Sequence, residues 1–294
     1  MSWRVGLTFG ALCIIWGLPY FFIKLAVAEV SPVGVAWARI ALGACVLVPV
    51  ALKRGTLPAV LRHKGAVCAF AFAELVGPFF LISLGEQWVS SSFAGILIAT
   101  VPLMVIVLSP LFGVRESLSG RRLTGLVIGF VGVVTLLGLD VLGGPLGWVG
   151  AACVVTATLG YAAGSLIVQR YLSGVDELGA VAASLVVATV VLFPAAVLTA
   201  PDSVPSQLVL TSLVVLGVVC TAAALWLYFS LIAHIGAARA AVITYVNPAV
   251  AALLGIVVLH ESFGLGSALG LALILVGSWL ATHRAQPAPV SRSN

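Results

Sequence analysis

The sequence has 294 residues, of which 62% are hydrophobic and only 8% are charged, whereas about a quarter of the residues in a soluble domain are charged. Its 14 Lys and Arg and nine Asp and Glu are too few to cover the surface of a water-soluble globule of this length. The composition therefore excludes a soluble enzyme, a nucleic-acid-binding protein and a disordered scaffold, and it predicts an integral membrane protein.

Ten apolar runs follow one another along the chain, each close to the roughly 20 residues that an α-helix needs to cross a bilayer core of about 30 Å. The connections are short and carry most of the turn residues and charges, so no separate soluble domain is expected. The predicted helices are Val5–Ala26, Pro32–Leu52, Gly65–Gly85, Ser92–Val114, Leu123–Leu139, Leu146–Val168, Leu178–Leu198, Leu208–Ile232, Ala237–Leu259 and Leu265–Thr282.

The first run has one alternative interpretation, a cleaved signal peptide, because Ala26-Val27-Ala28 resembles a small-x-small cleavage site. The run is about 20 residues long, longer than the apolar core of a signal peptide. It also contains Trp16 and Pro19 and places Lys24 just before that site. These features favour a retained transmembrane helix.

The basic residues predict the orientation of the chain. Twelve of the 14 lie in alternate connections, and the other two, Lys24 and Arg39, lie within predicted helices. The remaining connections carry acidic residues instead. Because cytoplasmic connections are enriched in Lys and Arg, both termini are expected in the cytoplasm of a cell whose inner membrane the chain crosses. The basic connections contain Arg4, Lys53, Arg54, Arg62, Lys64, Arg115, Arg121, Arg122, Arg170, Arg239, Arg284 and Arg292; the acidic ones contain Glu29, Glu86, Asp140, Asp202 and Glu261.

An internal repeat relates the two halves at a spacing of 145 residues, most clearly in Glu116-Ser117 and Glu261-Ser262. The glycines that follow keep the same spacing, and Pro102 corresponds to Pro248 if the spacing is allowed to be one residue longer. Five helices per half is an odd number, so the two repeats must be inverted, as in many secondary transporters. The predicted units are residues 1–141, residues 142–284 and a short cytoplasmic tail, 285–294.

Several segments together resemble the EamA-type members of the drug/metabolite transporter superfamily. The first helix reads Trp16-Gly17 followed by Lys24, and the second contains Ala38-Arg39-Ile40. The second half contains Tyr245-Val246-Asn247-Pro248, then Leu259-His260-Glu261-Ser262, then Gly270 and Gly277. Glu74, in the third predicted helix, departs from the family pattern. The resemblance implies a ten-helix transporter, usually an exporter, of small metabolites such as amino acids, their derivatives or drugs.

Three ionisable residues lie inside predicted helices: Lys24, Arg39 and Glu74. A charge in the bilayer costs at least about 2.5 kcal/mol, so such residues usually mark an interior or functional site. Glu74 is a candidate proton-coupling carboxylate or counter-charge for a cationic substrate, with Arg39 and Lys24 binding an anionic group. The alternative is a structural ion pair between Arg39 and Glu74, with Lys24 extending to the membrane surface.

Proline and aromatic residues complete the candidate site. The prolines inside helices are expected to kink them and to shape or gate a cavity, because each removes a backbone hydrogen bond. The predicted gating prolines are Pro19, Pro78, Pro102 and Pro248; the predicted cavity-lining residues are Trp16, Tyr20, Tyr161, Trp226, Tyr228, Tyr245 and Asn247. The spacings Gly125-x3-Gly129, Gly160-x3-Gly164 and Gly266-x3-Gly270 predict close helix contacts.

Nothing in the sequence indicates a cofactor, a metal or a catalytic residue, since no Walker A, HExxH or GxSxG motif and no CxxC pair occurs. The expected function is secondary-active transport by alternating access, with a small-molecule substrate and the lipid bilayer as partners and no nucleic acid. A monomer is expected and a dimer is left open. The alternatives are a flippase for a lipid-linked intermediate and, less favoured, an intramembrane enzyme.

Overall fold

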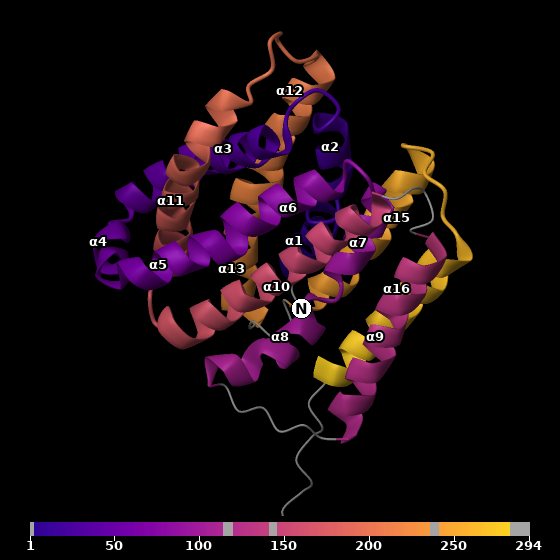
Figure 1. Cartoon of the computed structure of the whole chain (residues 1–294). Helices are drawn as coiled ribbons and strands as arrows, with labels where there is room; N and C mark the ends of the chain where they lie inside the picture. The colour runs from indigo at the N-terminus through magenta and orange to yellow at the C-terminus, as the bar shows by residue number, and fades with distance from the viewer. Residues whose placement is uncertain (1–2, 114–119, 141–145, 236–240, 283–294) are drawn as a thin grey trace, which may run out of the picture.

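The computed structural model describes residues 3–113, 120–140, 146–235 and 241–282, and all of the regular structure in these ranges is helical (Figure 1). Glu116 and Ser117 of the repeat motif, together with Arg115, Arg239, Arg284 and Arg292, lie outside the described residues. The first half contains α1 (Trp3–Ile15), α2 (Pro19–Ala26), α3 (Pro32–Lys53), α4 (Leu57–Val60), η1 (Leu61–His63), α5 (Lys64–Phe70), η2 (Ala71–Val76), α6 (Gly77–Gly85), α7 (Ser91–Ile98), α8 (Val101–Leu108), η3 (Ser109–Phe112) and α9 (Gly120–Asp140). The second half contains α10 (Gly147–Tyr171), α11 (Glu177–Leu198), α12 (Gln207–Val214), η4 (Val215–Ala223), α13 (Ala224–Ile235), η5 (Ala241–Tyr245), α15 (Asn247–Val257) and α16 (Leu265–Thr282).

Seven helices in the described ranges are long and apolar enough to cross a membrane, and an eighth span is formed if the bent pair α7 and α8 counts as one. Two further apolar helices, Ile243–Val257 and Leu265–Ala281, are shorter. At 1.5 Å per residue a 15-residue helix is about 22 Å long, which is less than the bilayer core. The protein is thus an all-helical, multi-pass membrane protein, and ten crossings remain a prediction.

Each of the four predicted gating prolines lies within the first two residues of a helical segment that follows a break or a change of helix type. Pro19 is the first residue of α2, after the break at residues 16–18, and Pro102 is the second residue of α8, after a bend of 40°. Pro248 is the second residue of α15, which follows the 3₁₀ segment η5, and Pro78 is the second residue of α6, which follows η2. The first turn of a helix tolerates a residue without a backbone N–H. The predicted helix interruptions are therefore present at all four prolines.

Polar side chains satisfy backbone groups at two of these breaks. Ser278 donates to the carbonyl of Ala99, between α7 and α8, at 3.1 Å. With the side-chain nitrogen of Asn247 turned towards the backbone, its amide donates to the carbonyls of Ile243 (2.9 Å) and Cys13 (3.2 Å). Free carbonyls inside a membrane protein require such partners, so the breaks are built into the packing.

Two segments, η2 and η4, are π-helical and lie inside otherwise continuous spans. A π-helical turn inside an α-helix often occurs at a functional site, because it redirects the side chains that follow. One of these segments contains Glu74 and the other contains Thr221. Both side chains belong to the candidate site described below.

The helices α9 and α16 pack closely along their length, through the glycines that the sequence pattern singled out (Figure 1). A methyl group on Gly277 would overlap the backbone of Gly129 and Gly125. Gly132 likewise faces the backbone of Gly270. Small residues let membrane helices approach closely, so the prediction of helix contacts is confirmed for Gly125-x3-Gly129 and at Gly270.

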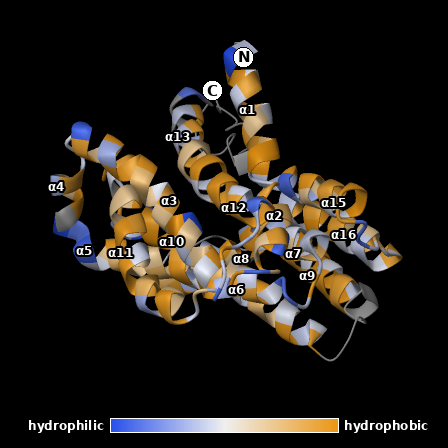
Figure 2. Cartoon of the chain, turned by 90° about the horizontal axis from the view of Figure 1, so that it is seen from above, coloured by the Kyte–Doolittle hydropathy of each residue, from blue (hydrophilic) through white to orange (hydrophobic). Residues whose placement is uncertain are grey.

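Hydrophobic residues cover most of the helices, and hydrophilic residues gather at helix ends, notably around α4 and α5 (Figure 2). Several of the connections that the charge pattern places on one side contact one another. The carboxylate of Glu29 accepts hydrogen bonds from the amide and hydroxyl of Ser206, both at 2.6 Å. Glu261 reaches the start of α7, at Ser91 and Ser92. These two contacts agree with the charge pattern, whereas the sides of the other connections and the orientation in the membrane stay predictions.

Candidate substrate site

Arg39 of α3 is buried, with 7% of its surface exposed, and it connects the two halves of the chain. Its Nε donates to Oγ1 of Thr221 in η4 at 2.9 Å. Its guanidinium carbon lies 3.8 Å from the centroid of the Phe79 ring of α6. A buried guanidinium on an aromatic face and a neutral hydroxyl is only partly compensated, so this cation is a candidate binding group for an anion.

The local sequence explains why α3 and η4 come so close. Gly43 faces the side chain of Thr221, and a methyl group there would be crowded against it. Gly217 faces Leu42 and the carbonyl of Arg39, and a methyl group there would overlap the Leu42 side chain. In the wider π-helical turn the hydroxyl of Thr221 donates to the carbonyl of Leu216 at 2.9 Å. That bond leaves its oxygen lone pairs free to accept from Arg39.

Glu74 lies in η2, and its Oε2 is buried without a hydrogen-bonding partner. The carboxylate packs against Gly164 of α10, where any side chain larger than hydrogen would collide with it. One turn earlier, Gly160 faces the carbonyl of Ala73 and the ring of Pro78. The predicted close contact at Gly160-x3-Gly164 is therefore confirmed. The lack of side chains at these two glycines leaves room for the segment that contains Glu74.

Arg39 and Glu74 do not hydrogen-bond each other in the described part of the chain, since Arg39 is engaged by Thr221 and Phe79. Tyr161 of α10 is within electrostatic range of both, and it also contacts the two main hydrophobic cores. Tyr20 of α2 is 7% exposed and within electrostatic range of Tyr161 and Arg39. A direct hydrogen bond or ion pair between Arg39 and Glu74, which the sequence left open, is thus absent from the described residues, and Tyr161 lies within electrostatic range of both side chains.

Lys24 is half-buried at the end of α2 and belongs to a different group of residues. Its Nζ donates to the backbone carbonyls of Glu86 (2.5 Å) and Val89 (2.8 Å), which follow α6. A cation at the C-terminal carbonyls of a helix is favourable. Lys24 therefore neither extends freely to the surface nor joins Arg39. Its neighbour Glu86, which the sequence places in a connection, is fully buried.

Glu261 caps the first turn of α7 across the boundary between the two halves. Its two carboxylate oxygens accept from the amides of Ser91 (2.7 Å) and Ser92 (3.0 Å) and from the Ser92 hydroxyl (2.5 Å). Gly255 makes room for this contact, because a side chain there would overlap Glu261 and Ser92. Burial raises the pKa of Glu261, but the hydrogen bonds from Ser92 and Ser91 outweigh it and leave the pKa below its ordinary value.

This shift predicts a pH dependence of stability. Because the pKa is lower in the folded than in the unfolded state, ionised Glu261 contributes stability above its ordinary pKa near 4.5, and this contribution is lost as the pH falls through the folded-state pKa. We expect Glu261→Gln to lower stability at pH 7 by roughly 1–2 kcal/mol, the usual range for a helix cap. The melting temperature of this variant in detergent should then fall less steeply below pH 4.5 than that of wild type.

Asp202→Asn is the matched control, because Asp202 is an exposed carboxylate in a connection. It should melt as wild type does at every pH. Some acid sensitivity should persist in Glu261→Gln, since the hydrogen bonds from Ser206 also lower the pKa of Glu29. A variant at Glu261 with the full wild-type pH dependence would show that the cap contributes nothing.

The contacts of the remaining predicted residues are mostly with other parts of the fold. Trp16 packs on Tyr228 with ring centroids 4.7 Å apart, in a small core near the N-terminus. Tyr245 is half-buried beside Asn247, which is satisfied by backbone carbonyls. Trp226 is exposed, and the guanidinium carbon of Arg54 lies 4.5 Å from the centroid of its ring. The structure therefore brings Tyr20, Arg39, Glu74 and Tyr161 together, with Tyr228 within electrostatic range of Glu74. The contacts described for Trp16, Trp226 and Asn247 are with other residues.

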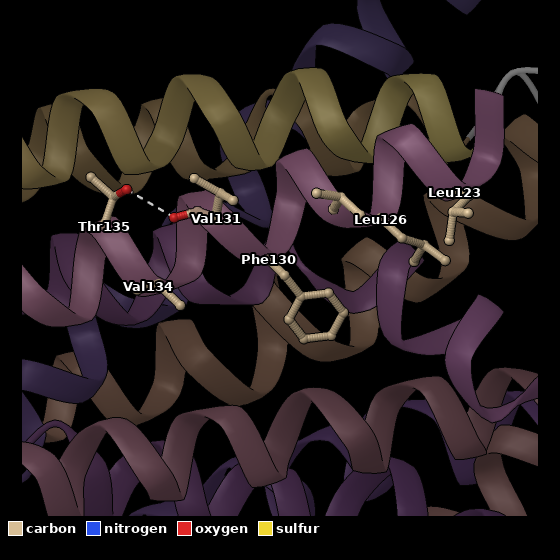
Figure 3. Close-up of a pocket in the computed structure, with 7 residues that line it drawn as sticks. Leu123, Leu126, Phe130, Val131, Val134 and Thr135 are labelled. Carbon is tan, nitrogen blue, oxygen red and sulfur yellow. Dashed lines mark hydrogen bonds between the residues drawn. The ribbon is translucent and has the colours of Figure 1, made fainter. Parts of the chain in front are cut away.

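A hollow of about 510 Å³ lies along α9 (Figure 3). Its only polar side chain, Thr135, donates to the carbonyl of Val131 at 2.8 Å and is thus occupied within its own helix. Substrate sites combine apolar walls with convergent polar groups, which this hollow lacks. Its surface suits contact with lipid chains rather than with a polar metabolite. The lining residues are Leu123, Leu126, Val127, Phe130, Val131, Val134 and Thr135.

Metal-binding clusters and disulfides are not found in the described ranges. No group of three or more His, Cys, Asp or Glu is placed there to hold a metal ion. All five cysteines are free.

Sequence and structure comparisons agree on the kind of protein that this chain resembles. A profile of the EamA-like transporter family matches twice, over residues 4–138 and 148–282. The uncharacterized inner membrane transporter YedA of Escherichia coli (strain K12) is 31% identical over 83% of this chain and 79% of its own length. An uncharacterized transporter of Archaeoglobus fulgidus is 28% identical over 92% of this chain and 95% of its own. A solved crystal structure aligns with a TM-score of 0.67 and 21% identity over 95% of this chain and 97% of that one, which shows a shared fold.

Proposed function

Because the chain belongs to the EamA-like transporter family, we propose that it is a secondary-active carrier that exports a small metabolite by alternating access. The observation that carries this proposal is the Arg39 group. A buried cation from the first half is held by a hydroxyl from the second half, and a buried carboxylate with an unpartnered oxygen lies nearby on η2. Substrate sites of inverted-repeat carriers lie at such an interface.

The proposed architecture is ten transmembrane helices in two inverted repeats, residues 1–141 and 142–284, with a tail at 285–294. In support, α3 and α11 both begin and both end 145 residues apart, and Pro49 and Pro194 lie at the same position within them. The π-helical segments η2 and η4 begin 144 residues apart. The two matches to the family profile begin at the same spacing. The bent pair of helices and the two shorter helices would supply the crossings beyond seven.

The proposed substrate carries an anionic group for Arg39 and a cationic group or an exchangeable proton for Glu74. Amino acids, their derivatives and drugs meet this requirement. We place the carrier in the inner membrane with both termini in the cytoplasm, where the basic connections would lie. Each chain holds both repeats, so a monomer would suffice.

Two alternatives can be distinguished from this proposal. An intramembrane enzyme would need a second acidic or imidazole group beside Glu74. Among the described residues, the carboxylate of Glu86 is fully buried, but it lies twelve residues further along the chain, just after the end of the same span, about 18 Å away at the rise of an α-helix. A flippase would accept a lipid-linked compound and would need a lateral opening. The names of the relatives indicate transporters, which favours a carrier over an enzyme.

Thermal stabilisation of the purified protein tests the proposal. A ligand that binds only the folded state at a hundred times its Kd stabilises by about 2.7 kcal/mol. We expect a zwitterionic or charged metabolite from a panel to raise the melting temperature by several degrees, and Arg39→Gln to lose this shift. Stabilisation by lipid-linked precursors alone would favour the flippase instead.

A further inference from the structure

Glu86 is a buried titratable group that the proposed transport site does not use. It follows the last residue of α6, and none of its surface is exposed. Both of its carboxylate oxygens are buried without a hydrogen-bonding partner. The hydroxyl of Ser91, a few residues further on, is also buried without one. A carboxylate in such surroundings needs either a partner or a proton.

The charged and titratable groups that face Glu86 come from three other parts of the fold. Lys24 of α2 is the first, but its ammonium is bound to the backbone carbonyls of Glu86 and Val89. Glu261, in the connection before α16, is a like charge whose oxygens are occupied by Ser91 and Ser92. Arg39 of α3 is engaged by Thr221 and Phe79, and Tyr20 of α2 is buried beside them.

These contacts determine which of the charges around Glu86 are stabilised by hydrogen bonds. Glu261 remains ionised, because three hydrogen bonds and the start of a helix stabilise its charge. Lys24 and Arg39 supply two positive charges, but the Lys24 ammonium donates to backbone carbonyls and Nε of Arg39 donates to Thr221, so neither cation is hydrogen-bonded to the carboxylate of Glu86. An ionised Glu86 would be a fully buried negative charge without a hydrogen-bond donor, and burying such a charge is very costly.

We infer that Glu86 holds a proton in this closed arrangement and releases it when the contacts of Lys24 and Glu261 open, which makes it a second proton-binding site, separate from Glu74. On release the O–H bond breaks, the proton passes to entering water, and the electron pair stays on the carboxylate, which the Lys24 ammonium then faces. The role in transport rests on the proposed function, whereas the protonation is a property of the resting protein.

Infrared spectroscopy of the purified protein at pH 7 tests this inference. Protonated carboxyl groups in apolar surroundings absorb separately from carboxylates. We expect wild type to show such a band, Glu86→Gln to have lost a clear part of it, and Glu261→Gln to retain it in full. A Glu86→Gln spectrum with the complete wild-type band would overturn the inference, because Glu86 would then be ionised.

Melting temperature provides a second measurement that does not need the spectrum. Gln resembles a protonated Glu in size and charge, so Glu86→Gln should fold and melt within about two degrees of wild type at pH 7, whereas Glu261→Gln should melt lower. Failure of Glu86→Gln to fold, or a fall as large as that of Glu261→Gln, would show that the negative charge of Glu86 is needed, and would also overturn the inference. Neither measurement involves transport, so they can succeed even if the proposed function fails.

Discussion

Replacement of Glu74 by Gln is expected to abolish pH-driven transport in proteoliposomes while leaving the protein inserted and folded. Gln keeps the shape that packs against Gly164 but cannot exchange a proton. Because Oε2 of Glu74 has no hydrogen-bonding partner, the substitution breaks no contact of that atom and should barely change the melting temperature. The measurement is uptake, driven by a pH gradient, of a metabolite that stabilises the protein.

Asp202→Asn again serves as the control, because it removes the same charge from an exposed connection and should transport as wild type does. Gly164→Ala is a second informative variant, since its methyl group would displace the Glu74 carboxylate. It should reduce pH-driven transport although it changes no ionisable group. If Glu74→Gln transports at the wild-type rate under a pH gradient, Glu74 is not the coupling group.

Replacement of Arg39 by Gln is expected to weaken binding of an anionic metabolite at least tenfold, or about 1.4 kcal/mol. Hydrogen bonds between a guanidinium and a carboxylate are among the strongest in proteins, and Gln supplies neither the charge nor the paired donors. The change also removes the contacts with Thr221 and Phe79. Isothermal titration with the stabilising metabolite measures the effect.

Two neighbouring variants separate binding from folding. Thr221→Val removes the hydroxyl that accepts from Nε of Arg39 but leaves the cation in place, so it should cost about 1 kcal/mol of stability and little affinity. Arg39→Lys keeps the charge but loses the planar, paired donors, so it should bind with intermediate affinity. An Arg39→Gln protein that is folded and binds as tightly as wild type would exclude Arg39 from the substrate site.

The sequence predicted those parts of the fold that depend on local chemistry. Pro102 and Pro248 lie at helix interruptions, because proline lacks the N–H that the preceding turn requires. Gly125 and Gly160 mark close helix contacts, because no side chain keeps the backbones apart. Burial of Arg39 followed from the cost of a charge in a membrane.

The features of the fold and of the candidate site that the sequence did not predict depend on long-range packing. Arg39 and Thr221 are 182 residues apart in the chain, and the π-helical turn that presents Thr221 has no signal in the sequence that we could recognise. The sequence places Glu86 in a connection after an apolar run but does not indicate that the fold buries it completely. Trp226 was expected inside, but Arg54 stacks on it at an exposed face. Such outcomes depend on which helices become neighbours.

Counterflow in proteoliposomes tests the central claim, that this chain is a carrier, most directly. Vesicles are loaded with an unlabelled metabolite that stabilises the protein, and a trace of the labelled compound is added outside. An alternating-access carrier should accumulate the label transiently above its outside concentration, with no energy source other than exchange. Label that never exceeds the outside concentration, for every metabolite that stabilises the protein, would contradict the account.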